Sequence, residues 1–252
     1  MEEKYKLGLV SVSFRKHSPK EILETMSAAG LSFIEWGSDI HAPYGDLVNL
    51  GELVKLQKMY DIKCSSYGTY FRIGETPIDE LEGYIKAAKI LGTDILRIWC
   101  GTKCGANMTD IEKSELLSLC CKASRIAEEQ GVILCMECHR STFTEDPRDA
   151  IWLIEKVNSK NFRMYWQPFQ WQTADENVLN ARKIAPYAEH IHVFNWKDDK
   201  KIPLSCAIDE WRKYLSEFSS PRTLLLEFMP CGTLEELKNE ANALKIIVGD
   251  IL

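Results

Sequence analysis

Residues 109–137, TDIEKSELLSLCCKASRIAEEQGVILCME, contain one helix and the strand that follows it. Thr109 and Glu112 have the spacing of a capping box, in which a hydroxyl and a carboxylate bond the free backbone N–H groups at a helix start. Gly131 favours the left-handed conformation that ends a helix, and the apolar run after it has the length of a buried strand. The stretch predicts a helix packed on a sheet through one apolar stripe: Leu116, Cys120, Ala123 and Ala127.

The same order of helix start, helix stop and apolar strand recurs along the whole chain. Helix starts are marked by capping boxes, or by a cap before proline, at Ser18, Thr76, Thr109, Asp146, Thr173 and Thr233. Helix stops are marked by Gly30, Gly92 and Gly131. We expect helices over 19–29, 49–60, 77–91, 110–130, 147–158, 176–184, 207–218 and 233–248. We expect strands over 7–13, 33–36, 63–67, 95–99, 132–137, 162–167, 190–195 and 223–228.

Strict alternation of eight strands with eight helices predicts a parallel sheet with right-handed crossovers. Because 252 residues suit eight such units, we expect an α/β fold, a (β/α)8 TIM barrel. The alternative is an open doubly wound sheet, which would carry a glycine-rich phosphate turn after its first strand; residues 12–15 contain no glycine. No linker or low-complexity segment divides the sequence, so residues 1–252 are expected to form one domain.

The composition is that of an ordinary globular protein, with 45% hydrophobic and 27% charged residues, which excludes fibrous and disordered chains. The formal net charge of −6 argues against a nucleic-acid partner, because neutralising phosphates requires a basic face. The charged N-terminus lacks the apolar core of a signal peptide, and no apolar window reaches the ~18 residues of a membrane span. We therefore expect a cytoplasmic protein without a membrane partner, and a homo-oligomer is compatible with the sequence.

Polar side chains lie at or near the ends of four consecutive predicted strands. They are Glu137, Gln167, His192 and Glu227, each about one strand–helix repeat from the next. Since the carboxyl ends of barrel strands meet at one rim, we expect these side chains to converge. Two carboxylates, an amide oxygen and an imidazole suit a divalent metal ion such as Mn²⁺, Co²⁺, Mg²⁺ or Zn²⁺. The alternative is that some of them cap loops or pair with lysines.

These strand ends resemble a known family. Glu137, His192 and Glu227, together with Phe33-Ile-Glu-Trp-Gly37 and Met136-Glu-Cys-His139, look like the xylose-isomerase-like sugar (phosphate) isomerase/epimerase family over nearly the whole chain. The resemblance implies a TIM barrel with a divalent metal held by Glu, Asp, His and Glu. It also implies a small-molecule carbohydrate substrate flanked by two catalytic glutamates, Glu137 and Glu227, as acid and base.

The sequence departs from this family at two positions. Gln167 stands where many members have the aspartate ligand, which removes one negative charge and weakens the hold on a metal. Gln170 stands where some epimerases have a substrate-binding histidine, so we expect it near the substrate. The four predicted ligands remain Glu137, Gln167, His192 and Glu227.

The chemistry implied is proton abstraction next to a carbonyl, through a metal-stabilised enediolate, by one glutamate and return of the proton by the other. Return on the opposite face gives an epimer, and return at the neighbouring carbon gives an aldose–ketose isomer. The same groups are compatible with a lyase or dehydratase. A sugar-binding barrel without turnover is another alternative, and an endonuclease at abasic DNA sites is disfavoured by the acidic charge.

Other residues are candidates for substrate contact. Arg97 is a charge within an apolar strand, so it needs a partner, either a carboxylate of the site or a structural ion pair in the barrel interior. His41 follows the second strand, where it contacts either a sugar hydroxyl or its own loop. Lys197 follows the seventh strand, whose loop often takes part in the phosphate site of a barrel; a free sugar or polyol is the favoured alternative to a phosphorylated substrate. The remaining candidates are the aromatic and imidazole side chains of Trp99, His139 and Trp196.

Overall fold

The computed structural model describes residues 5–197, 199–220 and 222–249, in which eight parallel strands close into a barrel. The ring order is β1-β10-β7-β6-β5-β4-β3-β2, so β1 pairs with both β2 and β10. The predicted TIM barrel is confirmed, and the open doubly wound alternative is wrong. The barrel strands are β1 (Tyr5–Val10), β2 (Phe33–Gly37), β3 (Lys63–Ile73), β4 (Ile95–Cys100), β5 (Ile133–Met136), β6 (Phe162–Trp166), β7 (Ala188–Val193) and β10 (Arg222–Leu226).

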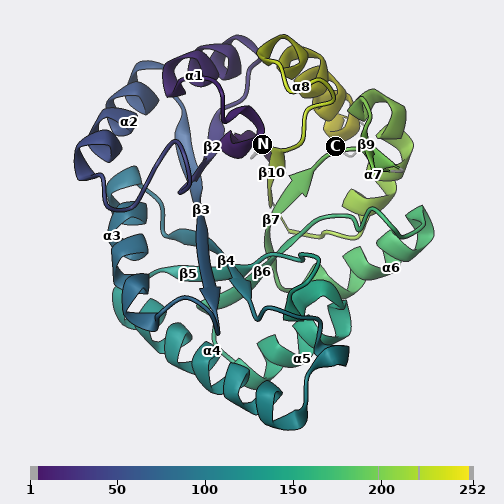
Figure 1. Ribbon diagram of the computed structural model, residues 1–252. Coiled ribbons are helices and arrows are strands. Elements are labelled where there is room, and N and C mark those ends of the chain that lie inside the picture. The colour runs from purple at the N-terminus through teal and green to yellow at the C-terminus, as the bar shows by residue number, and fades with distance from the viewer. Residues whose placement is uncertain (1–4, 198, 221, 250–252) are drawn as a thin grey trace.

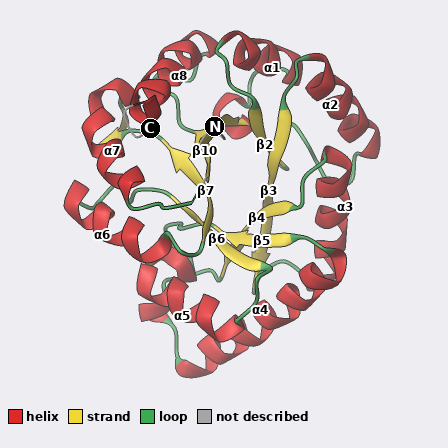
Figure 2. Cartoon of the chain, turned by 180° about the vertical axis from the view of Figure 1, so that it is seen from behind, coloured by secondary structure: helices red, strands yellow, loops and turns green. Residues whose placement is uncertain are grey.

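Helices alternate with the barrel strands and form an outer layer around them (Figures 1 and 2). The predicted capping boxes at Ser18, Thr109 and Thr173 are all formed. Gly92 and Gly131 end their helices in the left-handed conformation, with φ of 87° and 67°. The helices are α1 (Pro19–Ala28), α2 (Leu47–Met59), α3 (Leu81–Leu91), α4 (Asp110–Gln130), α5 (Pro147–Val157), α6 (Ala174–Ile184), α7 (Ile208–Ser216) and α8 (Leu234–Gly249).

Among the described residues, most buried apolar side chains fall into two clusters. The smaller one consists of Val10, Val12, Cys135, Tyr165 and Leu225. The larger one includes the stripe predicted on α4, whose four residues are all buried. None of the helices that the structure describes combines the length and the apolar run that a bilayer crossing requires.

The first strand is shorter than the sequence indicates. β1 ends at Val10, and the residues expected to continue it form a 3-10 helix, η1 (Ser11–Phe14). The hydroxyl of Ser11 accepts a hydrogen bond from the backbone N–H of Gly37, at 2.9 Å. The backbone N–H at the end of β2 is therefore satisfied by a side-chain hydroxyl just after β1. In a longer β1, a backbone carbonyl would have been the acceptor.

The third strand is longer than expected. β3 reaches Ile73 because, after an irregularity between Gly68 and Arg72, it pairs with β4 again. A short antiparallel hairpin that the sequence did not indicate follows β7, with strands β8 (Trp196–Lys197) and β9 (Lys200–Lys201).

The third helix starts later than predicted. α3 begins at Leu81 after a short 3-10 helix, η2 (Ile78–Glu80). The predicted cap at Thr76 is wrong, since its hydroxyl accepts a hydrogen bond from the backbone N–H of Arg72 (3.0 Å), in the preceding strand. The other helices have boundaries within about two residues of those expected.

Candidate active site

Four polar side chains lie at or near the carboxyl ends of consecutive barrel strands, as the sequence predicts. Glu137 follows β5, Gln167 follows β6 and Glu227 follows β10, while His192 lies in β7 next to its last residue. The backbone N–H groups of Glu137 and Glu227 donate to carbonyls of β4 and β7, at 3.1 and 2.9 Å. These hydrogen bonds continue the strand ladders, so both carboxylates are held by the rigid sheet.

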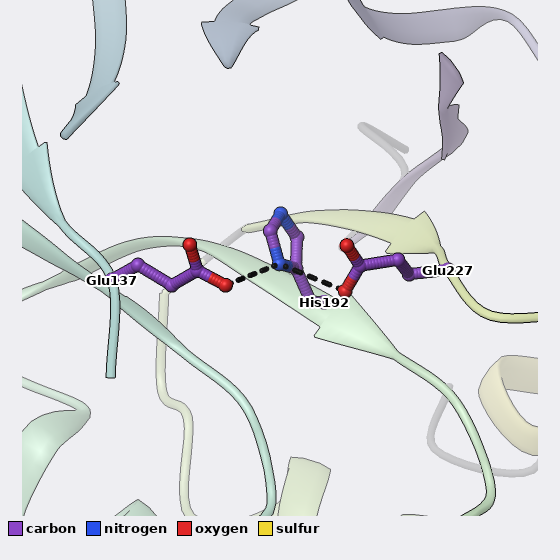
Figure 3. Close-up of side chains that lie close together, drawn as sticks. All are labelled: Glu137, His192 and Glu227. Atoms are coloured by element: carbon purple, nitrogen blue, oxygen red, sulfur yellow. Dashed lines mark ion pairs between the residues drawn. The ribbon is translucent and has the colours of Figure 1, made fainter. Parts of the chain in front are cut away.

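Three of these side chains converge on Nδ1 of the fourth, His192. This nitrogen is 3.2 Å from Gln167 Oε1, 3.4 Å from Glu227 Oε2 and 3.7 Å from Glu137 Oε1. Figure 3 shows the two carboxylates approaching the imidazole from opposite sides. One potential ligand atom from each of Glu137, His192 and Glu227 lies within 4.8 Å of the others, and all three residues are buried.

The donor set fits a divalent cation. Oε2 of Glu227 is buried and has no hydrogen-bond partner among the residues that the structure describes. A buried carboxylate oxygen without a partner is costly, and a cation among the four donors would compensate it. Gln167 is already oriented for this role, because its Nε2 donates to the carbonyl of Cys138 (2.8 Å) and its Oε1 faces His192.

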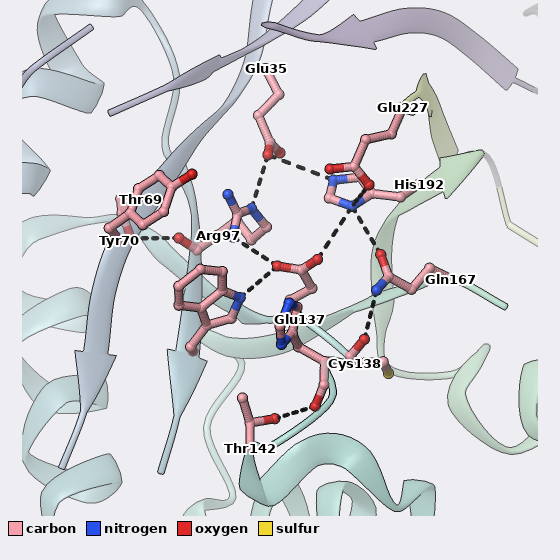
Figure 4. A network of polar contacts seen from close by, with 12 residues as sticks. Glu35, Thr69, Tyr70, Arg97, Glu137, Cys138, Thr142, Gln167, His192 and Glu227 are labelled. Carbon is pink, nitrogen blue, oxygen red and sulfur yellow. Dashed lines mark hydrogen bonds and ion pairs between the residues drawn. The ribbon is translucent and has the colours of Figure 1, made fainter. Parts of the chain in front are cut away.

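An ion-pair network adjoins these donors (Figure 4). Arg97 donates through Nε to Glu35 Oε1, at 3.0 Å, and through Nη1 to Glu137 Oε2, at 2.7 Å. The indole Nε1 of Trp99 donates to the same Glu137 oxygen, at 2.6 Å. The side chains of Arg97 and Glu35 are 4% and 0% exposed. Arg97 therefore realises both predicted alternatives, since it pairs with a site carboxylate and with a carboxylate of the barrel interior.

The buried cluster has an excess of negative charge. With His192 neutral, as a metal ligand must be, the carboxylates of Glu35, Glu137 and Glu227 and the guanidinium of Arg97 give a sum of −2. A divalent cation bound beside a neutral His192 would bring this sum to zero. Such compensation matters because an uncompensated charge is costly in the low-dielectric interior.

The pKa values of the site reflect this crowding. Burial opposes the charged form of His192, but the surrounding carboxylates, Glu227 above all, raise its pKa to about 10. Burial, followed by repulsion from Glu137, raises the pKa of Glu227 to about 7. Burial also acts to raise the pKa of Glu137 and Glu35, yet Arg97 and His192 outweigh it and lower both, that of Glu35 to about 2. The two carboxylates flanking His192 therefore differ in proton affinity.

A cavity of about 400 Å³ lies against the donors and has the size of a small-ligand site. Glu137, Gln167 and Glu227 line it. Five residues predicted to contact substrate also line it, namely Arg97, Trp99, His139, Gln170 and Trp196.

Two predicted substrate contacts lie elsewhere. The imidazole of His41 is 3% exposed, and its Nε2 lies 3.1 Å from the carbonyl of His17, so it stabilises its loop and does not line the cavity. Lys197 pairs with Glu210 at 2.9 Å and lines a neighbouring cavity of about 300 Å³. Both placements depend on loop conformations that strand and helix patterns do not encode.

Sequence reasoning missed several residues around the cavity. Glu35 had a recognisable signal, because it is a charge within the apolar strand FIEWG, as Arg97 is within ILRIWC. Tyr70 and Phe228 line the cavity, whereas Glu35 is fully buried beside it. Phe228 directly follows Glu227 and has a left-handed φ of 56°, a strained conformation that is common at functional sites.

Solved structures with the same fold include enzymes and a zinc-bound protein. The probable 3-DHS dehydratase AsbF of Bacillus anthracis has a TM-score of 0.81 and 17% identity, over 95% of this chain and 98% of that one. The IOLI protein with a bound zinc atom has a TM-score of 0.79 and 18% identity, over 98% and 99%. A D-psicose 3-epimerase crystallised in the presence of D-fructose has a TM-score of 0.70 and 13% identity, over 97% and 99%. At these identities the likeness establishes the fold.

No curated protein matches the sequence significantly. A family model described as xylose isomerase-like TIM barrel matches residues 23–228, which is most of the chain. The match spans all four strand-end donors and agrees with the closed eight-stranded ring. The chain therefore belongs to the xylose isomerase-like TIM barrel family.

Proposed function

We propose that this protein is a metal-dependent isomerase or epimerase of a sugar-like carbonyl compound. The observation that carries the proposal is the convergence of Glu137, His192 and Glu227, whose ligand atoms lie within 4.8 Å of one another at a cavity of about 400 Å³. Two carboxylates facing one small-ligand cavity are what proton removal and proton return next to a carbonyl require.

The cation would be held by four atoms already directed at one another: Glu137 Oε1, Gln167 Oε1, His192 Nδ1 and Glu227 Oε2. When bound, a divalent cation polarises a substrate carbonyl and lowers the pKa of the adjacent C–H. Glu137 and Glu227 flank His192 from opposite sides (Figure 3), so a substrate carbon between them has one carboxylate on each face. One carboxylate removes the proton and the other returns it.

The cavity wall supports a carbohydrate as the substrate. Trp99, Trp196 and Phe228 present aromatic rings, on which the apolar faces of sugar rings stack. His139 and Gln170 add hydrogen-bonding groups that suit hydroxyls. The epimerase of similar fold that was crystallised with D-fructose agrees with this substrate class.

Dehydration of an anionic substrate is a second candidate. Arg140 lines the cavity and lies over the ring of Trp171, at 4.6 Å, without an acidic partner among the described residues. A free guanidinium at the cavity suits a substrate carboxylate. Proton removal next to a carbonyl, followed by loss of a hydroxyl, would then give an unsaturated product.

The test is to incubate the metal-supplemented protein with ketoses and their phosphates in D₂O and to follow the C–H next to the carbonyl by NMR. Deuterium should enter at this carbon, because a carboxylate that exchanges the abstracted proton with solvent returns a deuteron. Glu227→Gln and Glu137→Gln should each lower the rate by at least about 10²–10⁴-fold. Glu240→Gln, which alters a buried carboxyl outside the cavity, is the matched control and should leave the rate unchanged.

Other outcomes separate the alternatives. An absorbing unsaturated product from a carboxylated substrate, lost in Arg140→Ala, would establish the dehydratase. Sugar binding by calorimetry without deuterium exchange would indicate a binding protein. Full turnover in Glu137→Gln would remove this residue from the mechanism.

A further inference from the structure

Glu35 lies behind the donors, within the barrel, and is fully buried. Its Oε2 accepts a hydrogen bond from the hydroxyl of Ser66, at 2.8 Å. Its Oε1 accepts from Arg97 Nε, at 3.0 Å, and lies 3.6 Å from Nε2 of His192 (Figure 4). One carboxylate oxygen thus faces His192, which is one of the donors, and Arg97, which contacts the donor Glu137.

The first of these side chains is His192, whose two ring nitrogens have different surroundings. Nδ1 faces the oxygens of Gln167, Glu227 and Glu137, whereas Nε2 has no hydrogen-bond partner within the described residues and has Glu35 Oε1 at ion-pair distance. A neutral imidazole carries its proton on one nitrogen only, and a histidine that binds a metal through one nitrogen usually donates the other N–H to a carboxylate or carbonyl. Glu35 is placed to keep that proton on Nε2.

The second side chain is Arg97. Its Nε donates to Glu35, and its Nη1 donates to Oε2 of Glu137. Because Oε2 is occupied in this way, Oε1 of Glu137 is the oxygen directed at His192. The glycine at position 68 leaves space for the Glu35–Arg97 ion pair. A Cβ at Gly68 would lie 2.6 Å from Glu35 Oε1 and 3.1 Å from Arg97 Nη2. Any larger residue at position 68 would push Glu35 and Arg97 out of this arrangement.

We propose that Glu35 is a positioning residue for the cation site, an inference that rests on the proposed function. It holds His192 as the Nε2–H tautomer, so that the unprotonated Nδ1 faces the cation, and it orients Arg97 so that Glu137 presents Oε1. It also supplies one of the three negative charges that give the cluster its sum of −2, although it is not among the residues that line the cavity.

The test is zinc binding by Glu35→Gln, in which the side chain keeps its size but loses its charge and so becomes a weaker acceptor for Arg97 and His192. We expect its zinc affinity, measured by competition with a chromophoric chelator, to fall about 10–100-fold, the usual effect of removing a group that orients a metal ligand. Long-range ¹H–¹⁵N spectra of the zinc-loaded protein should show a single Nε2–H tautomer of His192 in the wild type and a changed signal in the variant. Ser66→Ala is the control, because it removes only the donor to Oε2.

The outcomes are distinct. Wild-type zinc affinity and an unchanged His192 spectrum in a folded Glu35→Gln protein would overturn the positioning role. If Glu35→Gln does not fold by circular dichroism, Glu35→Asp is judged by the same two readouts, because it keeps the charge but withdraws the carboxylate from His192 and Arg97. Failure of the wild type to bind zinc at all would instead overturn the cation site of the proposed function.

Discussion

The amide of Gln167 is oriented by one hydrogen bond, from its Nε2 to the carbonyl of Cys138, and this contact directs Oε1 toward His192. A carboxylate here would add a fourth negative charge to the buried cluster. Like charges at close range disfavour one another when no cation compensates them, so the effect of such a substitution depends on the metal.

We therefore predict opposite effects of Gln167→Asp with and without a divalent cation. In chelator the variant should melt at a lower temperature than the wild type, because of the added repulsion. With Mn²⁺ or Zn²⁺ its melting temperature should rise by more than that of the wild type, since the cation gains a charged ligand. Gln170→Asp, with the same charge change on the cavity wall, should show neither effect. A smaller cation-induced rise in Gln167→Asp would show that the shorter side chain does not reach the ion.

The residues of the site were predictable to different degrees. Glu137, Gln167, His192 and Glu227 could be identified because each stands at or near the end of an apolar strand, and the barrel brings strand ends together. The partners of Arg97 could not be identified, because they depend on which side chains share the barrel interior. The sequence also left two roles open for His41, and the structure shows the loop contact, because the path of a loop depends on tertiary contacts such as its bond to the carbonyl of His17.

At the scale of elements, α8 is tied to the 3-10 helix η5 (Leu204–Ala207) that precedes α7. Both carboxylate oxygens of Glu240, on α8, lie 3.2 Å from the backbone N–H of Leu204, which donates to them. Burial, followed by the charge of Glu236, raises the pKa of Glu240 to about 7. A carboxyl with a raised pKa in the folded state favours folding in its protonated form, so its ionisation lowers the free energy of unfolding as the pH rises from about 4.5 to 7.

Glu240→Gln should remove this loss, because an amide can accept the hydrogen bond without ionising. At pH 8 the variant should be more stable than the wild type by about 1–2 kcal/mol, an order of magnitude set by 1.4 kcal/mol per pKa unit and reduced for solvent screening. At pH 5 the difference should vanish or reverse. Urea unfolding at the two pH values measures it, with the exposed Glu235→Gln of the same helix as the control. A constant difference between pH 5 and 8 would contradict the assignment.

The elements themselves could be predicted wherever local chemistry determines them. Hydroxyl caps and left-handed glycines located most helix ends, and apolar runs located all eight barrel strands. The departures arise from contacts between segments distant in the sequence. β1 ends where the hydroxyl of Ser11 accepts a hydrogen bond from Gly37. β3 continues because it pairs with β4 again, in a shifted register.

On the scale of the whole molecule, the four donors come from β5, β6, β7 and β10, which are consecutive in the ring. A cation bound to all four would link half of the barrel, so it should stabilise the entire fold. By mass action the gain is about 2.7 kcal/mol at a free concentration of 100 Kd. Calorimetry should show a rise in the wild-type melting temperature that shrinks in His192→Ala and Glu227→Gln. His139→Ala, which changes a cavity residue outside the donor set, should keep the full rise; equal rises in all variants would place the ion elsewhere.

The charge sum of the buried cluster also bears on which ions could compete for this place. A monovalent ion such as Na⁺ or K⁺ would leave the cluster of Glu35, Glu137, Glu227 and Arg97 negative, and a trivalent ion would leave it positive. Either remainder is unfavourable in a medium of low dielectric constant. Ligand softness and ionic radius would then discriminate only among divalent ions. The charges in the barrel interior would thus select ions by valence. Glu35 of β2 and Arg97 of β4 contribute to this selection as much as the residues that hold the ion.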